Sequence, residues 1–445
     1  MNNEQILDSL VAQGGPTCLV IKATLEPVGE QDRFQPAGFP EVGHVIYDAP
    51  RKNNGKEKVC IIDSAASMAN HLESVCLAGP NDVELHADLA GLPYVVCTTD
   101  RAYSVENGTI KLNPQDAHDK AVVTSLTEGH RVASDYFLDG CLEPTWVAEQ
   151  KQKKKVNGEK KEKTIAAHWK GETFRERLRQ EFGIVEVEKG KRYFIHPEDW
   201  WAIYQTVFKY DPNSLVHGIL LAKEQIKISR FLTASLEGFG AARVGRSGVK
   251  FDRLGKTLSG QPIFAVDEET ARQIRATFIL DLALLRSYGR GDKGLNLNQK
   301  KLLLGLALWK IKSLLAQPFR YRSQCHLHCT EVVLLPEGEA ATDSANSQPQ
   351  APEEQPSSVA TEGEATTDSA ASQRENENSG KGQEVLPALI SQLSLRPFIE
   401  ACKFSGEVPT KVYYPADELF KVGKESDAAA AEGADDNNDA PPEEE

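Results

Sequence analysis

Residues 17–25 read TCLVIKATL, a stretch with an apolar side chain at every second position. Successive side chains of a β-strand point to opposite faces, so alternation of this kind is typical of a strand with one buried face. The side chains that share the apolar face are Leu19, Ile21, Ala23 and Leu25. The pattern predicts a strand that opens the core sheet.

A second strand is predicted at residues 59–62, followed at once by a helix. Asp63 or Ser64 can cap the helix, because a side-chain oxygen at that position accepts a hydrogen bond from a backbone N–H of the first turn. The positions predicted to face inward are Met68, Leu72 and Val75 or Cys76. Together with the first strand, these segments form a β-loop-β-α unit.

Further apolar patterns extend this unit into a mixture of strands and helices. The predicted elements are a strand at 94–97, helices at 125–138, 173–182 and 199–208, and two helices within 267–316 joined by the basic turn SYGRGDKG at 287–294. In the first of these two helices, Ile274, Phe278, Leu282 and Leu285 are predicted to form a buried stripe. This mixture predicts an α+β fold.

Charge is distributed unevenly along the chain. The whole chain has 51 basic and 65 acidic residues and a formal net charge of −14. From Pro336 onward there are 24 acidic and 7 basic residues, which leaves 44 basic and 41 acidic residues in the first 335. The folded part is therefore slightly basic, and the acidic pI of the whole chain is a poor guide to its partners.

Composition divides the chain into four regions. Residues 1–336 form the core with its insertions, including a mobile basic loop at about 150–165 whose sequence KQKKKVNGEKKEK has seven lysines and only Val156 to bury. Residues 337–384 form an acidic insert predicted to be disordered, in which EGEAATDSANSQ returns as EGEATTDSAASQ. Residues 385–422 are apolar enough to return to the core. Residues 423–445 form a disordered acidic tail.

Targeting signals and cysteine usage predict a cytoplasmic protein. The eight cysteines have no regular spacing, which fits a reducing compartment better than a disulfide framework. The first residues, MNNEQILDSLVAQGG, lack the basic start and apolar run of a signal peptide. No apolar stretch reaches the roughly 18 residues that a membrane span needs, so no membrane partner is expected.

Two basic clusters in the second half of the chain predict contacts with RNA. Residues 227–256 contain seven basic residues against two acidic ones, and residues 286–322 contain nine against one. Glycines and aromatic residues interleave with the charges, as in proteins that bind phosphates and stack bases. The expected RNA contacts are Arg230, Arg243, Arg246, Lys250, Arg253, Arg290, Lys293, Arg320 and Arg322. For any single residue, a solvated face with core aromatics explains the pattern as well.

Two further segments are predicted as candidate contact sites. The loop at 32–47 contains Arg33, Phe34 and Phe39, and it either inserts between bases or under a neighbouring subunit, or packs against its own sheet. His130 and Arg131 are expected at a basic helix end that contacts RNA. With Glu128 they could also form a general acid/base group, but no recognisable nucleophile accompanies them.

No cofactor or metal site is predicted. Residues 289–294 (GRGDKG) match GxGxxG, but they follow an apparently helical segment and not a strand, so they do not fit a dinucleotide fingerprint. Residues 325–329 (CHLHC) offer cysteine and histidine ligands. On a strand, alternation places the cysteines and histidines on opposite faces, which disfavours one tetrahedral zinc site.

Four segments together resemble a known family, the repeated backbone subunit of type I-G (formerly I-U) CRISPR effector complexes, within the RAMP superfamily. They are RFQPAGFPEVGHVIYDAP at 33–50, IIDSAASMANHLE at 61–73, SLTEGHRVASDYFLDG at 125–140 and DPNSLVHGILLA at 211–222. The resemblance implies an RRM-like (ferredoxin-like) core sheet with helical and loop insertions. It does not extend to the lysine-rich segment or to the acidic repeat.

The resemblance also implies a function and a set of partners. Several copies of such a subunit polymerise head to tail along a guide RNA (crRNA), beside other subunits of the complex, and the guide pairs with target DNA. This role needs no catalytic residue, metal or cofactor. Two alternatives are a metal-dependent RNA-cleaving subunit that uses the loop aspartate Asp32, and a scaffold that binds only proteins.

Overall fold

The fold is described from a computed structural model of the protein. The structure describes residues 3–39, 43–51, 54–80, 82–100, 103–106, 109–112, 119–147, 150–156, 159–165, 168–188, 192–195, 200–245, 268–335 and 393–419. Helices and strands alternate along these segments, and the predicted α+β class is confirmed. No helix in the described segments is long and apolar enough to cross a membrane.

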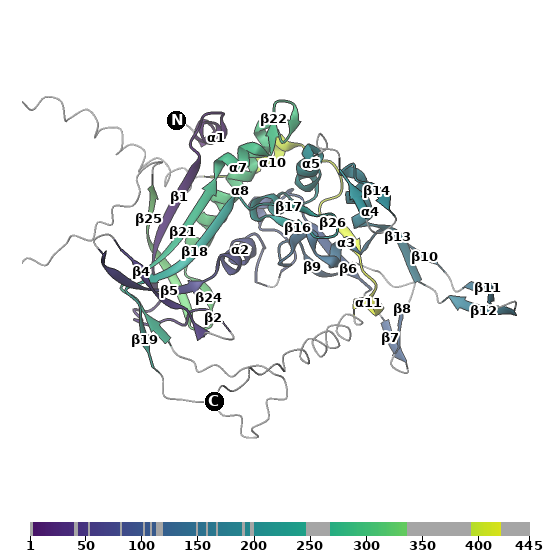
Figure 1. Ribbon diagram of the computed structural model, residues 1–445, viewed down its shortest axis with the longest axis horizontal. Helices are drawn as coiled ribbons and strands as arrows, with labels where there is room; N and C mark the ends of the chain where they lie inside the picture. Colours follow the sequence, from purple (N-terminus) through teal and green to yellow (C-terminus); the bar gives the residue numbers. More distant parts are fainter. Residues whose placement is uncertain are drawn as a thin grey trace, which may run out of the picture.

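A seven-stranded sheet dominates the fold, and all of its neighbouring strands are antiparallel (Figure 1). In spatial order its strands are β24 (Phe319–Arg322), β25 (Cys325–Leu335), β1 (Cys18–Pro27), β21 (Gln273–Asp281), β18 (Leu232–Phe239), β5 (Lys56–Asp63) and β4 (Ile46–Pro50). The sheet curls strongly. The curl brings Arg322 of β24 close to Asp63 of β5, with 2.6 Å between Arg322 Nη2 and Asp63 Oδ1.

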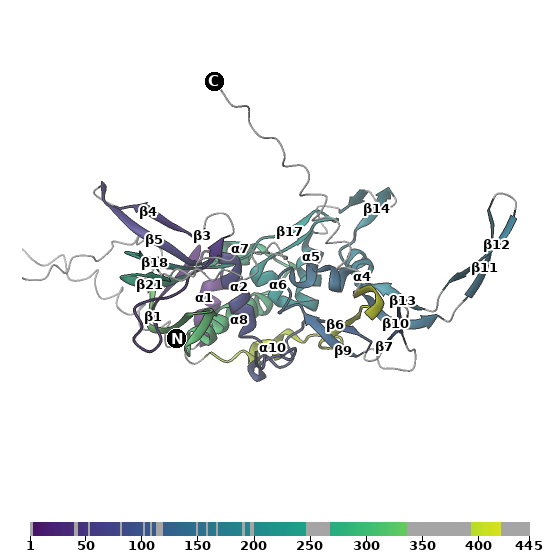
Figure 2. The ribbon, with the colours of Figure 1, turned by 90° about the horizontal axis from the view of Figure 1, so that it is seen from below.

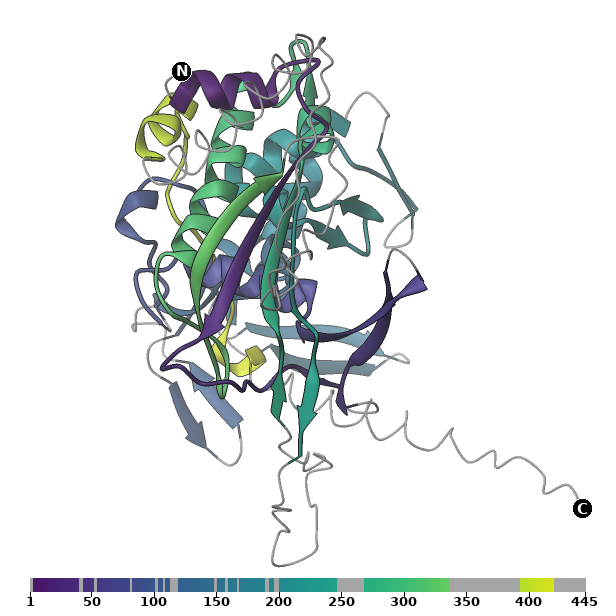
Figure 3. The same ribbon diagram turned by 90° about the vertical axis from the view of Figure 1, so that its left-hand side faces the viewer.

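The predicted first strand lies in the middle of this sheet. β1 pairs with β21 on one side and with β25 on the other, and its alternate residues from Leu19 to Leu25 are buried as predicted. The intervening residues are half-buried on the opposite face. The sheet therefore has one face against the core and one more open face, which is turned to the viewer in Figure 3.

Two helices, α2 (Ala65–Ser74) and α8 (Leu297–Leu315), lie behind the sheet in Figure 3. α2 begins where it was predicted, since the Ser64 side chain accepts a hydrogen bond from Ser67 N. In α8, Asn296 and Gln299 form a capping box, in which each side chain bonds the other residue's backbone N–H. Almost every residue in the middle of α8 is buried, so this helix is the centre of the core.

A five-stranded sheet lies beyond these helices (Figures 1 and 2). Its strands in spatial order are β13 (His168–Thr173), β10 (Cys141–Val147), β26 (Thr410–Tyr413), β6 (Val95–Thr99) and β9 (Lys120–Thr124). β26 comes from the C-terminal segment and pairs parallel with β6. One continuous hydrophobic cluster connects both sheets and the helices between them.

The helices predicted at 173–182 and 199–208 are confirmed as α4 and α5. The remaining elements surround the two sheets. They are α1 (Asn3–Val11), β2 (Gly38–Phe39), β3 (Gly43–His44), β7 (Tyr103–Glu106), β8 (Thr109–Leu112), α3 (Asp135–Leu138), β11 (Gln150–Val156), β12 (Glu159–Ile165), α4 (Phe174–Glu181), β14 (Val185–Glu188), β15 (Arg192–Phe194), α5 (Trp200–Tyr210), α6 (Pro212–His217), β16 (Ile219–Leu221), β17 (Ile226–Ile228), β19 (Ala242–Val244), β20 (Glu268–Thr270), α7 (Leu282–Ser287), β22 (Gly289–Arg290), β23 (Lys293–Gly294), α10 (Arg396–Cys402) and α11 (Ala416–Leu419).

The helix predicted at 125–138 was wrong over most of its length. The segment consists of turns, a short 3₁₀ helix at Arg131–Ala133 and the four-residue α3. Thr124 and Thr127 exchange side-chain and backbone hydrogen bonds here, including one of 2.8 Å from Thr124 N to Thr127 Oγ1. Such local bonds offer the backbone an alternative to the helix.

The first helix predicted within 267–316 was wrong for residues 273–281 and is confirmed only for the short α7, where Leu282 and Leu285 are buried as predicted. Residues 273–281 form strand β21, whose buried residues are Ile274, Ala276, Phe278 and Leu280. Their spacing is two, which is the period of a strand, whereas the predicted helical stripe included only Ile274 and Phe278 of these four residues. The predicted basic turn is present as the small hairpin β22–β23, which joins α7 to α8.

The segment predicted as a mobile basic loop contains a β-hairpin. β11 pairs with β12 in register from Gln150 opposite Ile165 to Val156 opposite Glu159. Asn157 and Gly158 stand between the two strands in the sequence, and Asn-Gly is a strong hairpin signal that the composition argument overlooked. The acidic repeat, the acidic tail and residues 385–392 lie outside the described residues.

Candidate nucleic-acid interface

The loop predicted as a contact site crosses one end of the large sheet. Phe34 and Glu269 of β20 exchange two backbone hydrogen bonds of 2.9 Å, and Ala37 N donates to Ile62 O of β5 at 2.9 Å. Phe34 is only 1% exposed and belongs to the main core. Its ring, which was predicted to contact RNA, therefore packs against its own sheet, as in the second of the two alternatives predicted for this loop.

Two buried glutamates collect basic side chains at this end of the sheet. Glu269, with a fully buried side chain, lies 3.1 Å from His44 Nδ1 and 3.3 Å from Arg243 Nε. Glu268 lies 3.2 Å from Arg33 Nε. We call this group of five residues the glutamate-anchored cluster. It brings together two predicted RNA contacts, Arg33 and Arg243, that are far apart in the sequence.

The arginines of the glutamate-anchored cluster remain accessible to a ligand. The side chain of Arg33 is 50% exposed and that of Arg243 is 52% exposed. A guanidinium has five N–H donors in a planar fork, so it can bind a carboxylate along one edge and a phosphate along another. The glutamates thus fix the position of the arginines and leave about half of their surface to solvent.

A pocket lies beside this cluster. Its volume is about 480 Å³, and the residues that line it are His44, Ile46, Lys58, Ala241, Ala242 and Arg243. Apolar side chains and cations share its wall. This is the combination that holds a base by contact and its phosphate by charge.

On the open face of the sheet, Phe239 lies between two arginines. Arg275 Cζ is 4.0 Å and Arg51 Cζ is 5.6 Å from the ring centroid, which places both in the range of cation–π contacts. Phe239 also packs with Ala49 and Val59 in a small cluster separate from the main core. Because the ring is only 8% exposed, the two arginines and not the ring form the surface here.

The basic hairpin β22–β23 lies at the other end of the large sheet. Arg290 and Lys293 are exposed and pair directly across the hairpin. In Figure 1, β22 is at the opposite end of the large sheet from β19, which carries Arg243. Among the described residues, Arg290 and Lys293 therefore do not share one patch with Arg33 and Arg243.

Arg320 and Arg322 are on the edge strand β24. Arg320 is exposed, whereas Arg322 binds the buried Asp63, which also accepts from His71 Nε2 at 2.8 Å and Ser67 Oγ at 3.0 Å. Burial alone would raise the pKa of Asp63, but the hydrogen bond from His71 and the charge of Arg322 outweigh it, and the pKa is lowered. Arg322 thus holds the curled sheet together across its width.

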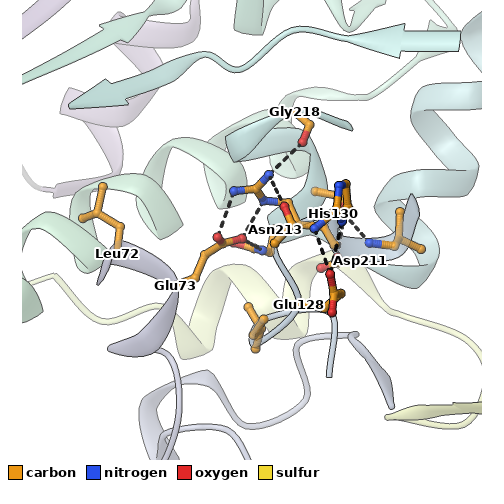
Figure 4. A network of polar contacts seen from close by, with 12 residues as sticks. Leu72, Glu73, Glu128, His130, Asp211, Asn213 and Gly218 are labelled. Carbon is orange, nitrogen blue, oxygen red and sulfur yellow. Dashed lines mark hydrogen bonds and ion pairs between the residues drawn. The ribbon is translucent and has the colours of Figure 1, made fainter. Parts of the chain in front are cut away.

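Three of the segments that carry the family resemblance meet in a buried polar network (Figure 4). Arg131 donates to Glu73 from Nε at 2.6 Å and from Nη2 at 2.9 Å, and to Gly218 O at 3.3 Å. Asn213 Nδ2 donates to Glu73 at 2.6 Å, and Lys310 of α8 donates to Asn213 Oδ1. Arg131, which was predicted to contact RNA, is only 7% exposed, and its guanidinium binds this network.

Burial perturbs the ionisable groups around this network. It raises the pKa of Asp211 to about 7, and the charge of Glu73 adds to the rise despite hydrogen bonds from Ser214 and Ser125. Burial lowers the pKa of Lys310 and holds the pKa of His217 well below its usual value. The network joins α2, the 125–134 segment, α6 and α8, so its first effect is on stability.

The other residues that were predicted to contact RNA are either in the described part of the chain or outside it. The side chain of His130 is 83% exposed and lies 3.2 Å from Glu128, and Arg230 is exposed just before β18. Phe39 lies in the short strand β2. Arg246, Lys250 and Arg253 lie outside the described residues.

Sequence reasoning missed several residues of this region. Glu268, Glu269 and Arg275 were placed in a predicted helix, so their positions in the sheet were hidden. The alternation of residues 273–281 was the signal that could have assigned Arg275 to the open face. No sequence signal connects Glu268 to Arg33, because their contact depends on the pairing of β20 with the segment at Phe34.

One comparison with known proteins gives a match. The sequence profile of the family described as CRISPR-associated protein GSU0053 matches residues 19–243. A comparison with curated proteins finds no match. The matched range extends from β1 to β19 and includes Arg33, Arg243 and all the members of the buried network named above except Lys310.

Proposed function

The chain belongs to the family of CRISPR-associated protein GSU0053, and from this we propose that it is a backbone subunit of a CRISPR surveillance complex that holds guide RNA along its spacer. In this role it contacts phosphates and leaves sequence recognition to the pairing of guide RNA with target DNA. Its partners are the guide, copies of itself arranged head to tail, and other subunits of the complex. A cytoplasmic location fits this role.

The strand order supports an RRM-like core within this proposal. Along the chain, β1, α2, β18, β21, α8 and β25 follow a β-α-β-β-α-β pattern, and in space the four strands lie in the order β25, β1, β21, β18. This pattern is that of a ferredoxin-like split β-α-β unit. The open face of such a sheet is where RRM domains bind RNA.

The observation that carries the proposal is the glutamate-anchored cluster. Arg33 and Arg243 are held by buried carboxylates while half of each side chain stays exposed. β19 ends at Val244 and β20 begins at Glu268, so the segment with Arg246, Lys250 and Arg253 leaves and re-enters the fold beside this cluster. A basic, glycine-containing segment attached to anchored arginines favours a phosphate backbone as the ligand.

We further propose that the subunit does not cleave the RNA that it holds. Asp32, the residue of the catalytic alternative, has an 83% exposed side chain and lies 3.8 Å from Arg33 Nε. A cation beside an exposed single carboxylate disfavours a metal ion there. Incubation of bound RNA with Mg²⁺ should give no regularly spaced products, and products that disappear in Asp32→Ala would contradict this part of the proposal.

The RNA-binding proposal can be tested with the variant Arg33→Gln/Arg243→Gln. Glutamine still donates a hydrogen bond to the buried glutamates, but it has no charge for a phosphate. Fluorescence anisotropy with a labelled single-stranded RNA should show weaker binding for all sequences, with a salt slope that is shallower by about two units, one for each residue.

Arg396→Gln is the matched control. Arg396 also binds a carboxylate, Glu400, at 3.1 Å, but it lies on α10, away from the glutamate-anchored cluster. Thermal unfolding of each variant excludes a folding defect. If the double variant folds normally and keeps the salt slope of the unmodified protein, the glutamate-anchored cluster is not a phosphate site.

A further inference from the structure

The β11–β12 hairpin projects from the far end of the molecule. Figures 1 and 2 show it beyond β10 and β13, at the opposite end from β19 and the glutamate-anchored cluster. Its two strands form a sheet with each other, and within the described part of the chain no third strand joins them. Residues 150–165 contain seven lysines and two glutamates, so the hairpin has a strong positive charge.

The backbone register of this hairpin places lysine positions opposite each other. Lys154 pairs with Lys161, and on the next rung Lys155 pairs with Lys160. Like charges directly opposite in an antiparallel pair are destabilising, and an isolated two-stranded hairpin is only marginally stable in water. A bound polyanion would neutralise the net positive charge that seven lysines and two glutamates give these residues. The charge pattern therefore favours a polyanionic partner.

Aromatic side chains lie at the base of the same hairpin. Trp146 of β10 pairs with Trp169 of β13, one rung before the end of their ladder, and the two ring centroids are 5.1 Å apart. Trp169 in turn contacts Tyr413 of β26 at 5.5 Å. Both tryptophans are only half-buried.

A buried carboxylate fixes this row of aromatic rings. Asp100, which is fully buried, accepts from Trp169 Nε1 at 3.2 Å and from Tyr413 Oη at 2.6 Å. The ring of Trp169 is therefore held in one orientation, and Trp146 packs edge to face against it. A rigid aromatic platform loses little entropy when a base stacks on it.

We propose that the hairpin and the tryptophan pair form a second nucleic-acid-binding surface, which takes a single-stranded segment. Bases stack on Trp146 and Trp169, and the phosphates that follow lie along the basic hairpin. Stacking needs unpaired bases, which favours a single strand over a duplex. This surface goes beyond the proposed function because it is separate from the glutamate-anchored cluster, and either could exist without the other.

Two variants separate charge from stacking. Lys154→Gln/Lys155→Gln removes one charge from each like-charge rung, and Trp146→Ala removes one ring, while Trp146→Phe restores an aromatic surface. Lys223→Gln/Lys403→Gln is the matched control, since both lysines are exposed and lie outside the hairpin and outside the two basic clusters. All variants are made in the full chain and in the Arg33→Gln/Arg243→Gln background, so that failure at one surface is distinguished from failure at the other.

The probes are labelled oligo(dT) and oligo(U) of about 20 nucleotides, which exceeds the range of about 4–16 nucleotides for a single OB-fold site, and a duplex of the same length. We expect the lysine variant to bind oligo(dT) with a salt slope that is shallower by one to two units. Its melting temperature should not fall, because the removed charges repelled each other. Trp146→Ala should weaken binding by about tenfold and Trp146→Phe should recover most of the loss. Comparison of oligo(dT) with oligo(U) shows whether DNA or RNA is preferred.

Two results would overturn the proposal. Unchanged oligo(dT) binding by the lysine variant would mean that the hairpin has another partner, such as an acidic protein. Equal binding of duplex and single strand, with no effect of Trp146→Ala, would mean that the hairpin attracts any polyanion and that the tryptophans have only a structural role.

Discussion

At the scale of single residues, Arg131 and Glu73 form a buried ion pair at the centre of the protein. Two short hydrogen bonds join them, and Asn213 donates a third to the same carboxylate. A buried charge that loses its partner is costly, because it has neither water nor an opposite charge to stabilise it. The stability of the protein should therefore depend strongly on this pair.

The variant Arg131→Met tests this dependence. It leaves Glu73 buried without its cation, so the free energy of unfolding should fall by about 3–5 kcal/mol, measured by urea unfolding followed by circular dichroism. The neighbouring exposed His130 provides the control, because His130→Ala should change stability by less than about 0.5 kcal/mol. Similar losses for both variants would contradict the assigned role of the ion pair.

Asp211 should make stability depend on pH. Its pKa is about 7 in the folded protein and about 3.9 in an unfolded chain. At a pH between these two values, Asp211 is protonated in the folded protein and ionised in the unfolded chain. Its contribution to the free energy of unfolding is therefore complete below about pH 4 and is lost as the pH rises through 7. Glu73 and Lys310 face the same carboxyl group, and His217 has the opposite trend because its folded pKa is lowered.

The variant Asp211→Asn isolates this contribution. His217 is present in both proteins, so its trend cancels when their free energies of unfolding are compared at each pH. The stability of the unmodified protein relative to the variant should decrease steadily from pH 5 to pH 7. A difference that stays constant over this range would show that Asp211 titrates at its ordinary pKa.

At the scale of elements, the sequence was informative wherever the hydrophobic period was unambiguous. The strand at 17–25 and the helix after Ser64 were predicted correctly, since alternation and a capping serine are local signals. Residues 273–281 were misassigned because Ile274 and Phe278 also fit a helical stripe, and only Ala276 and Leu280 distinguish the two periods. The lysine-rich hairpin was missed because charge was given more weight than the Asn-Gly turn signal.

The glycines of the GRGDKG motif should matter for packing and not for a ligand. Gly294 has φ +73°, and a Cβ added there would lie 2.4 Å from Tyr288 O and 2.7 Å from the Trp201 ring. Gly291 has a similar φ of +64° with nothing within 4 Å. Gly291→Ala should therefore cost about 1–2 kcal/mol of stability from its left-handed conformation alone.

Gly294→Ala has the same backbone cost and an additional overpacking cost of about 1–3 kcal/mol. The difference between the two alanine variants in urea unfolding isolates the crowding term, because both positions have positive φ. Equal destabilisation would mean that the hairpin relaxes around the added methyl group. That result would remove the packing explanation for Gly294.

At the scale of the whole molecule, the candidate site could be predicted only in part. The sequence identified Arg33 and Arg243 as charged candidates, but their common position depends on β20 pairing with the segment after β1. The carboxylates that hold them are more than 200 residues from Arg33 along the chain. Composition reports charge, whereas strand pairing decides which charges meet.

The central claim is that this chain holds guide RNA as part of a CRISPR complex. The most direct test is to purify the full chain with its neighbouring complex proteins and a guide, and to sequence the nucleic acid that copurifies. The account predicts RNA of uniform length that contains spacer sequence, lost in Arg33→Gln/Arg243→Gln and kept in Arg396→Gln. A nucleic-acid-free monomer would contradict it.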